Sequence, residues 1–272
     1  MLFEHAFAQP ESAFMKKLLN FTALILLTFA AGVSAQDGKK IKIGVEGAYP
    51  PFSELGSDGK IKGFDIDIAN ALCAQIKAQC TLVQQEFDGM IPSLQAKKID
   101  AIIASMSITD ERRKLVDFSD KYYHTPARFV AAKNAALSAT AAGMKGKRIG
   151  VQRTTIYDRF ATDTFKESEI VRNTKQDDVF LDLTSGRVDA VLVDQVAASQ
   201  GFLTSPAAKE FSFFGPVYIE PKYFGYGVGI GVRKADTALR NEFNEAIKTI
   251  RGNGVYKKIN DKYFSFDIYG GK

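Results

Sequence analysis

The sequence has few side chains that commonly bind metal ions. Of its 272 residues only two are histidine and two are cysteine. Protein zinc sites draw on clusters of Cys and His, and no such cluster occurs in the sequence. If an N-terminal leader is removed, His124 is the only histidine left. We therefore expect no metal site.

The two cysteines, Cys73 and Cys80, stand where an expected helix ends and a strand begins near Thr81. In an exported protein such a pair suggests a local disulfide that closes a small loop. Two buried free thiols are the alternative.

The chain also lacks a basic run. Its 36 Lys and Arg residues are interleaved with 31 Asp and Glu residues, and the formal net charge is +5. Proteins that bind nucleic acid concentrate Lys and Arg on one face, often beside aromatic side chains. We therefore expect no nucleic-acid partner and interpret the charges as a solvated surface.

Only one apolar run approaches membrane length, and it lies near the N-terminus. Lys16 and Lys17 follow Met15 and precede an apolar stretch over 18–33, which ends in small residues up to Ala35. This order is typical of a secretory signal peptide. A retained membrane anchor is the alternative, although the run is short for a transmembrane span. We expect translation to start at Met15 and cleavage to follow Ala35.

Short apolar strands alternate with helical patterns through the rest of the chain. The expected strands are Ile41–Val45, Thr81–Val83, Ala101–Ala104, Phe129–Ala132, Arg148–Val151 and Ala190–Val193. The expected helices are Asp65–Ile76, Asp88–Gln95, Thr155–Phe165, Gln176–Thr184, Thr237–Arg251 and Val255–Tyr263. This alternation predicts an α/β fold with largely parallel sheets.

Two breaks interrupt the alternation, at 123–127 and at 223–231. The first contains Pro126, and the second has glycine at every second position from Gly225 to Gly231. A dinucleotide-binding loop would need a helix start after its glycines, and none follows. We therefore expect no cofactor, and interpret these glycines as a strand that another backbone approaches closely. Both breaks are candidate crossings between two lobes.

A candidate anion-binding site lies at Ser105–Arg113 (SMSITDERR). Ile99–Ala104 reads as a buried strand, and Thr109 or Asp110 is the expected N-cap of the helix that follows. The N–H groups at a helix N-terminus lack partners and carry partial positive charge, so they bind anions. Arg112 would add a bidentate fork. A solvated helix face with hydroxyl caps is the alternative.

Five segments together resemble the periplasmic solute-binding proteins of ABC amino-acid importers, in the lysine/arginine/ornithine- or arginine-binding branch of family 3. They are IGVEGAYPPF (43–52), GFDIDIANALC (63–73), FDGMIPSLQAKKIDAIIASMSIT (87–109), LTSGRVDAVLVD (183–194) and KYFGYGVGIGVRK (222–234). The resemblance covers essentially all of the mature chain, in order and at family spacing.

This resemblance implies a periplasmic protein with a two-lobed Venus-flytrap α/β fold, a two-strand hinge and a ligand in the cleft between the lobes. Residues 37–125 and 226–272 would form lobe 1, and residues 126–225 would form lobe 2.

The resemblance also implies contacts to the backbone groups of an amino-acid ligand. Arg112 would pair with the α-carboxylate, helped by the hydroxyl and N–H of Ser107. Ser105 would contact the α-amino group through its backbone or its hydroxyl, and Asp194 would complete that site from the other lobe. Met106, between the two serines, is included among the expected contacts.

Three further residues match the family's side-chain pocket. Tyr49 and Phe87 would sandwich the aliphatic stem of the ligand, and Glu46 would face its distal cation. Taken singly, each aromatic residue reads as core and Glu46 as a surface acid. An aromatic wall with one acid favours Lys, Arg or ornithine through cation–π and Coulomb attraction.

One stretch departs from the family pattern. After the strand that ends at Val151, the family commonly has a glycine followed by small hydroxyl residues, whereas this chain has Thr154 in place of the glycine and Thr155 at the hydroxyl position. Thr155 and Ile156 would still donate backbone N–H groups to the carboxylate. Tyr157 replaces a polar pocket residue, and would either narrow the pocket or stack on a guanidinium.

The resemblance implies a monomeric, non-enzymatic protein that delivers arginine, lysine or ornithine to a membrane permease of an ABC transporter. An opine conjugate or histidine is an alternative ligand. A prephenate or arogenate dehydratase of the same fold is the alternative from another class, but its chemistry needs a general acid beside a dianionic ring, whereas Glu46 and Asp194 suit a cation. A receptor ectodomain or a chemosensor partner is a third hypothesis.

Overall fold

The computed structural model describes residues 1–2 and 38–270. Within these residues no helix is both long enough and apolar enough to cross a membrane. The predicted signal peptide lies outside the described residues.

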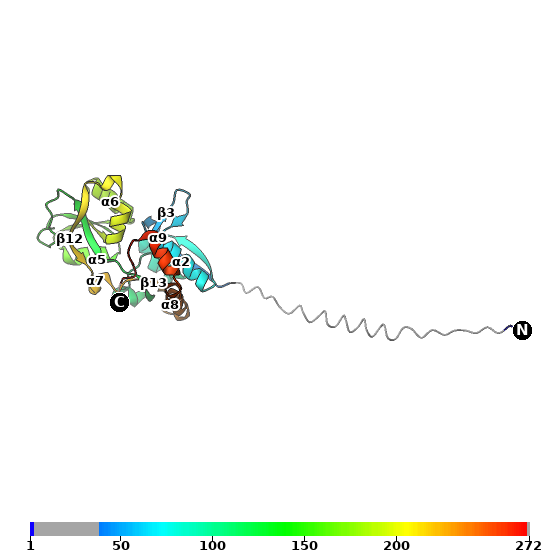
Figure 1. The fold of residues 1–272 in the computed structure, drawn as a ribbon. Coiled ribbons are helices and arrows are strands. Elements are labelled where there is room, and N and C mark those ends of the chain that lie inside the picture. The colour runs from blue at the N-terminus through cyan, green and yellow to red at the C-terminus, as the bar shows by residue number, and fades with distance from the viewer. Residues whose placement is uncertain (3–37, 271–272) are drawn as a thin grey trace. The chain divides into compact units, whose positions relative to one another are not determined.

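Residues 38–270 form a mixed α/β fold of two lobes, each built on a five-stranded sheet. The strand order is β5-β1-β6-β13-β7 in the first sheet and β10-β9-β11-β8-β12 in the second, and β2, β3 and β4 make a small third sheet. Figure 1 shows α5, α6 and β12 grouped in one lobe and α2, α8 and α9 grouped in the other.

The first lobe contains β1 (Lys40–Val45), β2 (Ala48–Tyr49), β3 (Ser53–Leu55), β4 (Ile61–Lys62), α2 (Phe64–Gln75), β5 (Gln79–Gln84), η1 (Phe87–Gly89), α3 (Met90–Gln95), β6 (Ala101–Ile102), α4 (Asp110–Leu115), β7 (Asp117–Tyr123), β13 (Val228–Val232), α8 (Thr237–Gly252) and α9 (Val255–Tyr263). The second contains β8 (Ala127–Ala132), β9 (Arg148–Gln152), α5 (Ile156–Thr164), β10 (Glu169–Asn173), α6 (Gln176–Thr184), β11 (Ala190–Asp194), η2 (Ala197–Phe202), η3 (Pro206–Ala208), β12 (Phe211–Tyr218) and α7 (Pro221–Phe224).

The sheets are less parallel than the sequence predicts. β1 runs parallel to β5 and β6, but β13 is antiparallel to both β6 and β7. In the second sheet β9 runs parallel to β10 and β11, while β8 is antiparallel to β11 and β12. The chain leaves the first sheet after β7, enters the second at β8, leaves it after β12 and returns at β13. The antiparallel pairings therefore involve the strands that adjoin these crossings.

The predicted strands and helices are present, with two changes. The strand expected over 99–104 is reduced to β6, because Ser105 takes a left-handed φ of 53° and turns the chain toward α4. The helix expected over 88–95 is a 3-10 turn followed by α3. The strands β7, β10 and β12 and the small sheet were not predicted. Polar residues hide the alternating pattern in β7 and β10, and a Gly-Pro pair interrupts it in β12. The strands of the small sheet, two or three residues long, are too short to show it.

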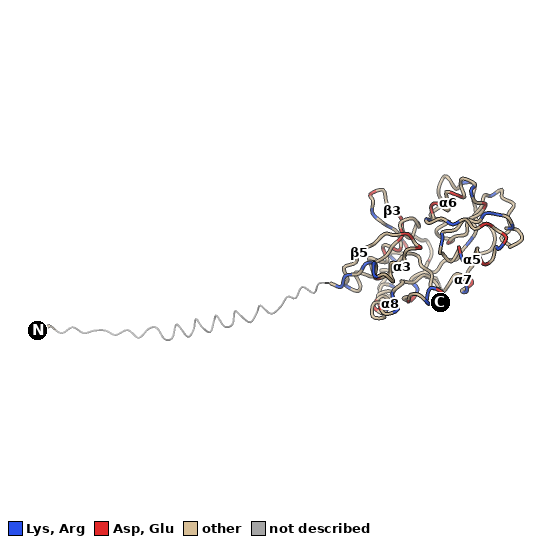
Figure 2. The backbone as a smooth tube through the Cα atoms, turned by 180° about the vertical axis from the view of Figure 1, so that it is seen from behind, with Lys and Arg blue, Asp and Glu red and all other residues tan. Residues whose placement is uncertain are grey.

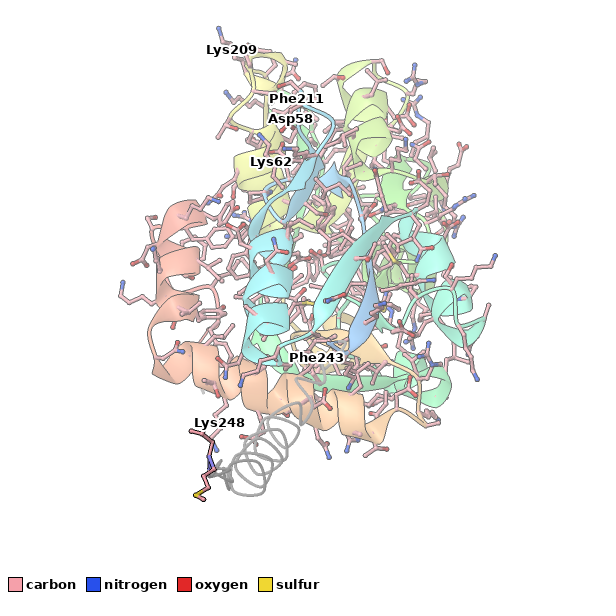
Figure 3. The ribbon with its side chains drawn as sticks, turned by 90° about the vertical axis from the view of Figure 1, so that its right-hand side faces the viewer. Asp58, Lys62, Lys209, Phe211, Phe243 and Lys248 are labelled. Carbon is pink, nitrogen blue, oxygen red and sulfur yellow. A yellow bond between two sulfur atoms is a disulfide. The ribbon has the colours of Figure 1, made fainter. Side chains whose placement is uncertain are left out.

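Amphipathic helices cover the first sheet. α8 buries Leu239, Phe243 and Ile247 and leaves Lys248 exposed to solvent, and Phe243 and Lys248 are labelled in Figure 3. Burial of one apolar stripe along the helix is what fixes it against the sheet.

Acidic and basic residues are interspersed along the chain, as the red and blue segments of Figure 2 show. Some form ion pairs between elements of one lobe, such as Lys39 with Glu242 at 2.6 Å. This distribution agrees with the solvated, interleaved surface expected from the sequence.

Glycines let β13 and the segment before it pass close to the loop that follows β6. A Cβ at Gly225, whose φ is 78°, would collide with the carbonyl oxygen of Ile108. A Cβ at Gly229 would lie 2.7 Å from Ile108 Cδ1. In the same region the Ile108 N–H donates to the Gly227 carbonyl at 2.8 Å, and the Tyr226 N–H donates to the Ile108 carbonyl at 3.0 Å. The alternating glycines thus permit the close backbone approach expected from the sequence.

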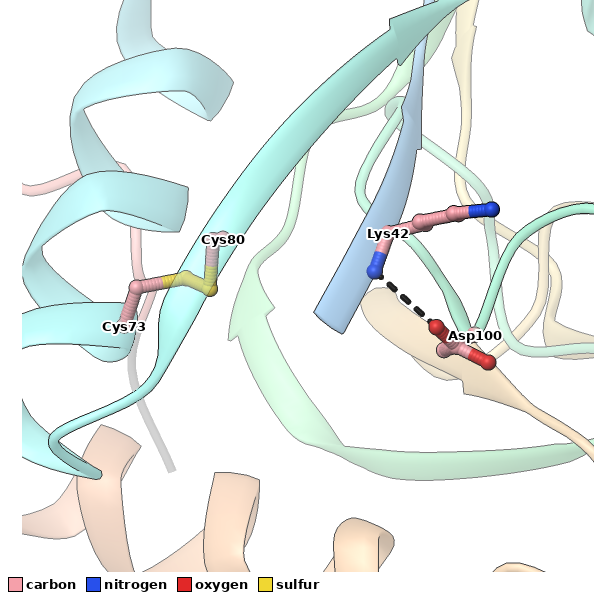
Figure 4. The surroundings of a disulfide bond; sticks show 4 residues. All are labelled: Lys42, Cys73, Cys80 and Asp100. Atoms are coloured by element: carbon pink, nitrogen blue, oxygen red, sulfur yellow. Dashed lines mark hydrogen bonds between the residues drawn. A yellow bond between two sulfur atoms is a disulfide. The ribbon is translucent and has the colours of Figure 1, made fainter. Parts of the chain in front are cut away.

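A disulfide joins Cys73 in α2 to Cys80 in β5 (Figure 4). This confirms the predicted pairing. Beside it, the Lys42 N–H of β1 donates to Asp100 Oδ2 at 3.0 Å (Figure 4). The bridge fixes the end of α2 against the edge strand of the first sheet.

We expect simultaneous substitution of Cys73→Ser and Cys80→Ser to lower the free energy of unfolding by about 2–3 kcal/mol, because the disulfide restricts the unfolded chain. Urea unfolding of the mature protein, followed by circular dichroism, measures this difference. Reduced wild-type protein is the control and should unfold like the double variant. A loss below about 0.5 kcal/mol would contradict a stabilising role.

Candidate functional site

A narrow cavity of about 20 Å³ lies between the two lobes. Its lining residues are Glu46, Tyr49, Phe87, Ala104, Ser105, Ser107, Arg112, Gln152, Thr155, Ile156 and Tyr157. They lie after β1 and β6, in β2, at the end of β9, and in the first turns of η1, α4 and α5, so ends of strands and starts of helices from both lobes meet here. Every predicted contact except Met106 and Asp194 lines this cavity.

A second, smaller cavity adjoins the first and brings in Asp194. Asp194 lines only this second cavity. Four residues line both cavities: Tyr49, Ser105, Ser107 and Tyr157. Met106 is placed differently from the other predicted contacts. Its side chain is 1% exposed and packs in the core of the first lobe, and it lines neither of these two cavities.

Arg112 occupies one end of the cavity. Thr109 is the N-cap of α4, and its Oγ1 accepts a hydrogen bond from the Arg112 N–H at 3.2 Å. The guanidinium donates to the carbonyl oxygens of Ser107 at 3.0 Å and Thr154 at 3.3 Å and lies 5.3 Å from the centre of the Phe87 ring. Burial lowers the pKa of Arg112 to about 10. Among residues 38–270, no carboxylate forms an ion pair with Arg112.

Backbone donors surround this guanidinium. Thr155 is the N-cap of α5, and its Oγ1 accepts from the Asp158 N–H at 3.2 Å. Within the described part of the chain, the N–H groups of Ser107, Thr155 and Ile156 and the Ser107 hydroxyl donate to no protein acceptor. Since such groups at a helix start favour an anion, this end of the cavity suits a carboxylate.

Thr154, which stands where the family pattern has a glycine, takes a left-handed backbone conformation. Its φ is 61°, which is unusual for a β-branched residue. Its N–H donates to Asp158 Oδ2 at 3.0 Å, while its carbonyl accepts from Arg112. These two hydrogen bonds hold the loop in place without a glycine.

Asp194 lines the second cavity and is 3% exposed. Its Oδ1 accepts from the N–H groups of Val196 at 2.7 Å and Ala197 at 2.9 Å. Its Oδ2 accepts from the hydroxyls of Thr125 and Tyr157, the second at 3.5 Å. Burial nevertheless raises the pKa of Asp194 to about 6. A cation beside this carboxylate would therefore be strongly favoured.

Ser105 is held by a buried acid that the sequence reasoning missed. Asp65 Oδ2 accepts from both the N–H (2.7 Å) and the hydroxyl (3.0 Å) of Ser105, and its Oδ1 accepts from the Tyr122 hydroxyl at 2.9 Å. Burial raises the pKa of Asp65 to about 7. Because the N–H and the hydroxyl hydrogen of Ser105 are both donated to Asp65, an ammonium beside Ser105 would be met by its acceptors, the carbonyl and the hydroxyl oxygen.

Glu46 marks the distal end of the cavity and is 2% exposed. Its Oε1 accepts from Gln152 Nε2 at 2.5 Å, and the same amide donates to the Thr174 carbonyl at 3.1 Å. Burial raises the pKa of Glu46 to about 8, and the nearby acids Glu86 and Asp177 add to the shift. Gln152 was not predicted. Its position at the end of β9 is the one signal that could have pointed to it.

Tyr157 lines both cavities and lies beside Asp194. Its hydroxyl is 3.5 Å from Asp194 Oδ2, and its ring lies 6.5 Å from that of Phe224. Burial and the charge of Asp194 raise the pKa of Tyr157 well above its usual value, so the hydroxyl stays protonated. This placement favours narrowing of the pocket over stacking on a distal guanidinium.

Ion pairs cross from the first lobe to the second at the rim of the cleft. In each of the following, the acid belongs to the first lobe and the base to the second: Asp88 with Arg153 (2.6 Å), Glu111 with Arg159, and Glu86 with Lys175 (3.7 Å). These contacts exist only while the lobes are close together. Exposed pairs of this kind are each worth little, so they guide closure more than they stabilise it.

The ionisable groups of the site are unmatched. Arg112, which is half-buried, supplies one positive charge, whereas the buried carboxyl groups of Glu46 and Asp194 can each supply a negative charge when ionised, and none of the three forms an ion pair with another residue of the described chain. Buried charges are costly unless they are paired. The site therefore suits a ligand with a carboxylate near Arg112, an ammonium near Asp194 and a second cation near Glu46.

A sequence model of the bacterial extracellular solute-binding proteins, family 3, matches residues 41–266. An L-arginine-binding protein of Pseudomonas aeruginosa is 51% identical over 258 residues, which cover 94% of this chain and 99% of that protein. A histidine-binding periplasmic protein of Salmonella typhimurium is 44% identical, with 94% and 100% covered. A lysine/arginine/ornithine-binding periplasmic protein of Escherichia coli is 43% identical, with 94% and 99% covered.

A solved structure shares the fold. A Salmonella typhimurium periplasmic binding protein described as having high arginine specificity superposes with a TM-score of 0.77 at 34% identity, over 84% of this chain and all of that one. It and the three relatives are named as binding proteins, and none of the four as an enzyme.

Proposed function

Since the chain belongs to family 3 of the bacterial extracellular solute-binding proteins, we propose that it binds a cationic L-amino acid and delivers it to the permease of an ABC transporter. The observation that carries this proposal is the set of ionisable groups in the cleft that have no ion-pair partner in the described chain, one guanidinium and two buried carboxyls. A cationic amino acid brings one carboxylate and two cations, and would pair all three.

In the proposed complex, the α-carboxylate lies between the Arg112 guanidinium, the Ser107 hydroxyl and the N–H groups of Thr155 and Ile156. The α-ammonium lies between Asp194 and the carbonyl of Ser105. Donors come from both lobes, because Arg112 belongs to α4 and the two N–H groups to the start of α5. A ligand that bridges them would hold the cleft closed.

Arginine is the ligand we favour among the cationic amino acids. Tyr49 and Phe87 line the cavity beside Glu46, and a flat guanidinium stacks on aromatic faces better than an ammonium does. Gln152 presents an amide next to Glu46, so a carboxylate and an amide oxygen are both near the distal group. A guanidinium has five donors to place, whereas an ammonium has three.

We also propose where and how the protein works. It is exported by the signal peptide that begins at Met15, is cleaved after Ala35 and acts in the periplasm as a monomer, without catalytic turnover. The lobes are divided at residues 125/126 and 225/226, and the two connecting segments act as the hinge.

Thermal unfolding of the mature protein tests the proposal, once bound ligand has been removed by unfolding and refolding. A ligand that binds only the folded state raises the melting temperature, and at 100 times its Kd it stabilises by about 2.7 kcal/mol. We expect a rise of several degrees with arginine, and smaller rises with lysine and ornithine.

Other outcomes would replace the proposal. A rise confined to histidine or to octopine would move the ligand to those alternatives. A rise with prephenate alone would call for an assay of turnover. No rise with any of the twenty amino acids, ornithine, citrulline or octopine would refute amino-acid binding.

A further inference from the structure

We propose that Asp65 is a positioning residue of the ligand site: it holds Ser105 in the left-handed conformation that turns the Ser105 carbonyl toward the ligand ammonium. This inference rests on the proposed function. It concerns a side chain that lines neither of the two cavities described above, and that acts through Ser105.

Asp65 is built to hold one conformation of its neighbours. It lies in the first turn of α2 and is 0% exposed. Among the hydrogen bonds of the described residues, its carboxylate accepts none from the N–H groups of that helix. Instead it accepts from three donors on two other elements, the N–H and hydroxyl of Ser105 and the hydroxyl of Tyr122 in β7. Asp65 thus ties α2, β7 and the loop after β6 together.

Ser105 needs such a restraint. Its φ of 53° is left-handed, and a residue with a Cβ adopts that region only at a cost. Two hydrogen bonds to one carboxylate oxygen offset this cost and fix both the backbone and the side chain. Without them the residue would relax toward the common negative-φ regions, and its carbonyl would turn.

The turn at Ser105 also places the carboxylate end of the site. Ser107 follows two residues later, forms a bridge with Val228 and leads directly into the Thr109 cap of α4. Any change at Ser105 is therefore transmitted to the groups that face the α-carboxylate. We expect loss of Asp65 to weaken the binding of every amino acid, whatever its side chain.

The restraint is one of geometry, and an amide can reproduce it. In Asp65→Asn the side-chain oxygen can still accept from Ser105, while the NH2 group donates to the Tyr122 oxygen. Asp65→Ala has no acceptor and leaves the Ser105 donors buried without a partner. The pair of variants therefore separates positioning from a direct effect of the negative charge on the ligand.

Isothermal titration of arginine into the mature protein tests the inference. We expect Asp65→Ala to bind arginine and citrulline more weakly by a similar factor, about 10-fold or more, and Asp65→Asn to stay within about threefold of wild type. Asp67→Ala is the matched control. It removes an acid from the same helix that contacts Lys262 and Tyr263, and should leave affinity unchanged.

Two results would overturn the inference. If Asp65→Ala binds like wild type, Ser105 needs no restraint. If Asp65→Asn loses as much affinity as Asp65→Ala, the charge matters and not the geometry. If wild type binds no amino acid, the proposed function fails and not this inference alone.

A test from the other side of the contact covers the case in which Asp65→Ala does not fold. Ser105→Gly and Ser105→Ala both lack the hydroxyl, but only glycine adopts positive φ without strain. If the backbone conformation at this position controls binding, the glycine variant binds at least as tightly as the alanine variant. Markedly tighter binding by the alanine variant would contradict the role assigned to Ser105.

Discussion

Replacement of Arg112 by alanine is expected to weaken the binding of every amino acid by at least about 100-fold. Among the described residues, the guanidinium is the only cation that lines the narrow cavity, and a ligand carboxylate buried there without it would lack its counter-charge. Removing one partner of a buried, hydrogen-bonded charge pair costs roughly 3–5 kcal/mol. The loss should be the same for arginine, citrulline and glutamine, because all three present the same α-carboxylate.

Isothermal titration of these three ligands checks the prediction, and the chain supplies a matched control. Arg113 is the next residue of α4, is exposed and lies 3.9 Å from Asp117. Arg113→Ala should leave all three affinities within about twofold of wild type, since exposed ion pairs contribute little. A larger loss for arginine than for glutamine in Arg112→Ala would contradict the assignment, because it would place Arg112 at the side-chain end.

The stability of the ligand-free protein gives an independent readout of the same residue. Arg112 has no carboxylate partner among residues 38–270, so its partial burial is a cost to the empty protein. We therefore expect Arg112→Ala to unfold without ligand at the same temperature as wild type or higher. If Arg112 served only the fold, Arg112→Ala would instead unfold at a lower temperature than wild type.

Much of the site could be predicted because its elements carry local signals. Thr109 precedes two acids at the start of α4, and Thr155 stands three residues before Asp158 in the first turn of α5, so both helix starts and their N–H groups follow from short-range patterns. The parallel strands β1, β9 and β11 are apolar runs, and the ends of such strands are where ligands bind in α/β folds. The role of each site residue was predicted from the family resemblance, because the type of a single residue does not show which group of a ligand it would contact.

Three features could not be read from the sequence because they depend on contacts between distant segments. Asp65 looks like an ordinary acid in the first turn of a helix, and its contact with Ser105 joins residues 40 positions apart. Gln152 meets Glu46 across the lobes. The left-handed backbone of Thr154 breaks the local preference of a β-branched residue, and it is set by hydrogen bonds to Asp158 and Arg112.

Substitution of Glu46→Gln is expected to remove the preference for cationic ligands and to leave neutral ones nearly unaffected. The amide has the shape of the carboxylate but no charge to offer a guanidinium. A hydrogen bond to a charged group contributes roughly 1.5–3 kcal/mol, so arginine should lose about 10- to 150-fold. Citrulline is the matched neutral ligand, because it has a urea group where arginine has the guanidinium.

Titration of arginine and of citrulline into both proteins measures this preference as the ratio of the two dissociation constants. Glu86→Gln is the control variant. It removes a neighbouring acid that pairs with Lys175 at the rim, and it should change the ratio by less than about threefold. Equal loss of arginine and citrulline in Glu46→Gln would refute the role assigned to Glu46.

The pH dependence of the same ratio tests why Glu46 is effective. Burial raises its pKa from the ordinary 4.5 to about 8, so below pH 8 the ligand-free protein holds a proton there, and a bound cation must expel it. The preference for arginine over citrulline should therefore fall as pH drops below 8, by about tenfold per unit, and level off above 8. Asp65 and Asp194 also titrate, but they act on both ligands and cancel in the ratio. As pH rises from 4.5 to 8, the unfolded chain releases the Glu46 proton while the folded, empty protein keeps it, so the empty protein loses stability over this range. Glu46→Gln avoids this loss and should unfold at a higher temperature than wild type at pH 8. A preference that is independent of pH between 6 and 8 would show that Glu46 is already ionised before the ligand arrives.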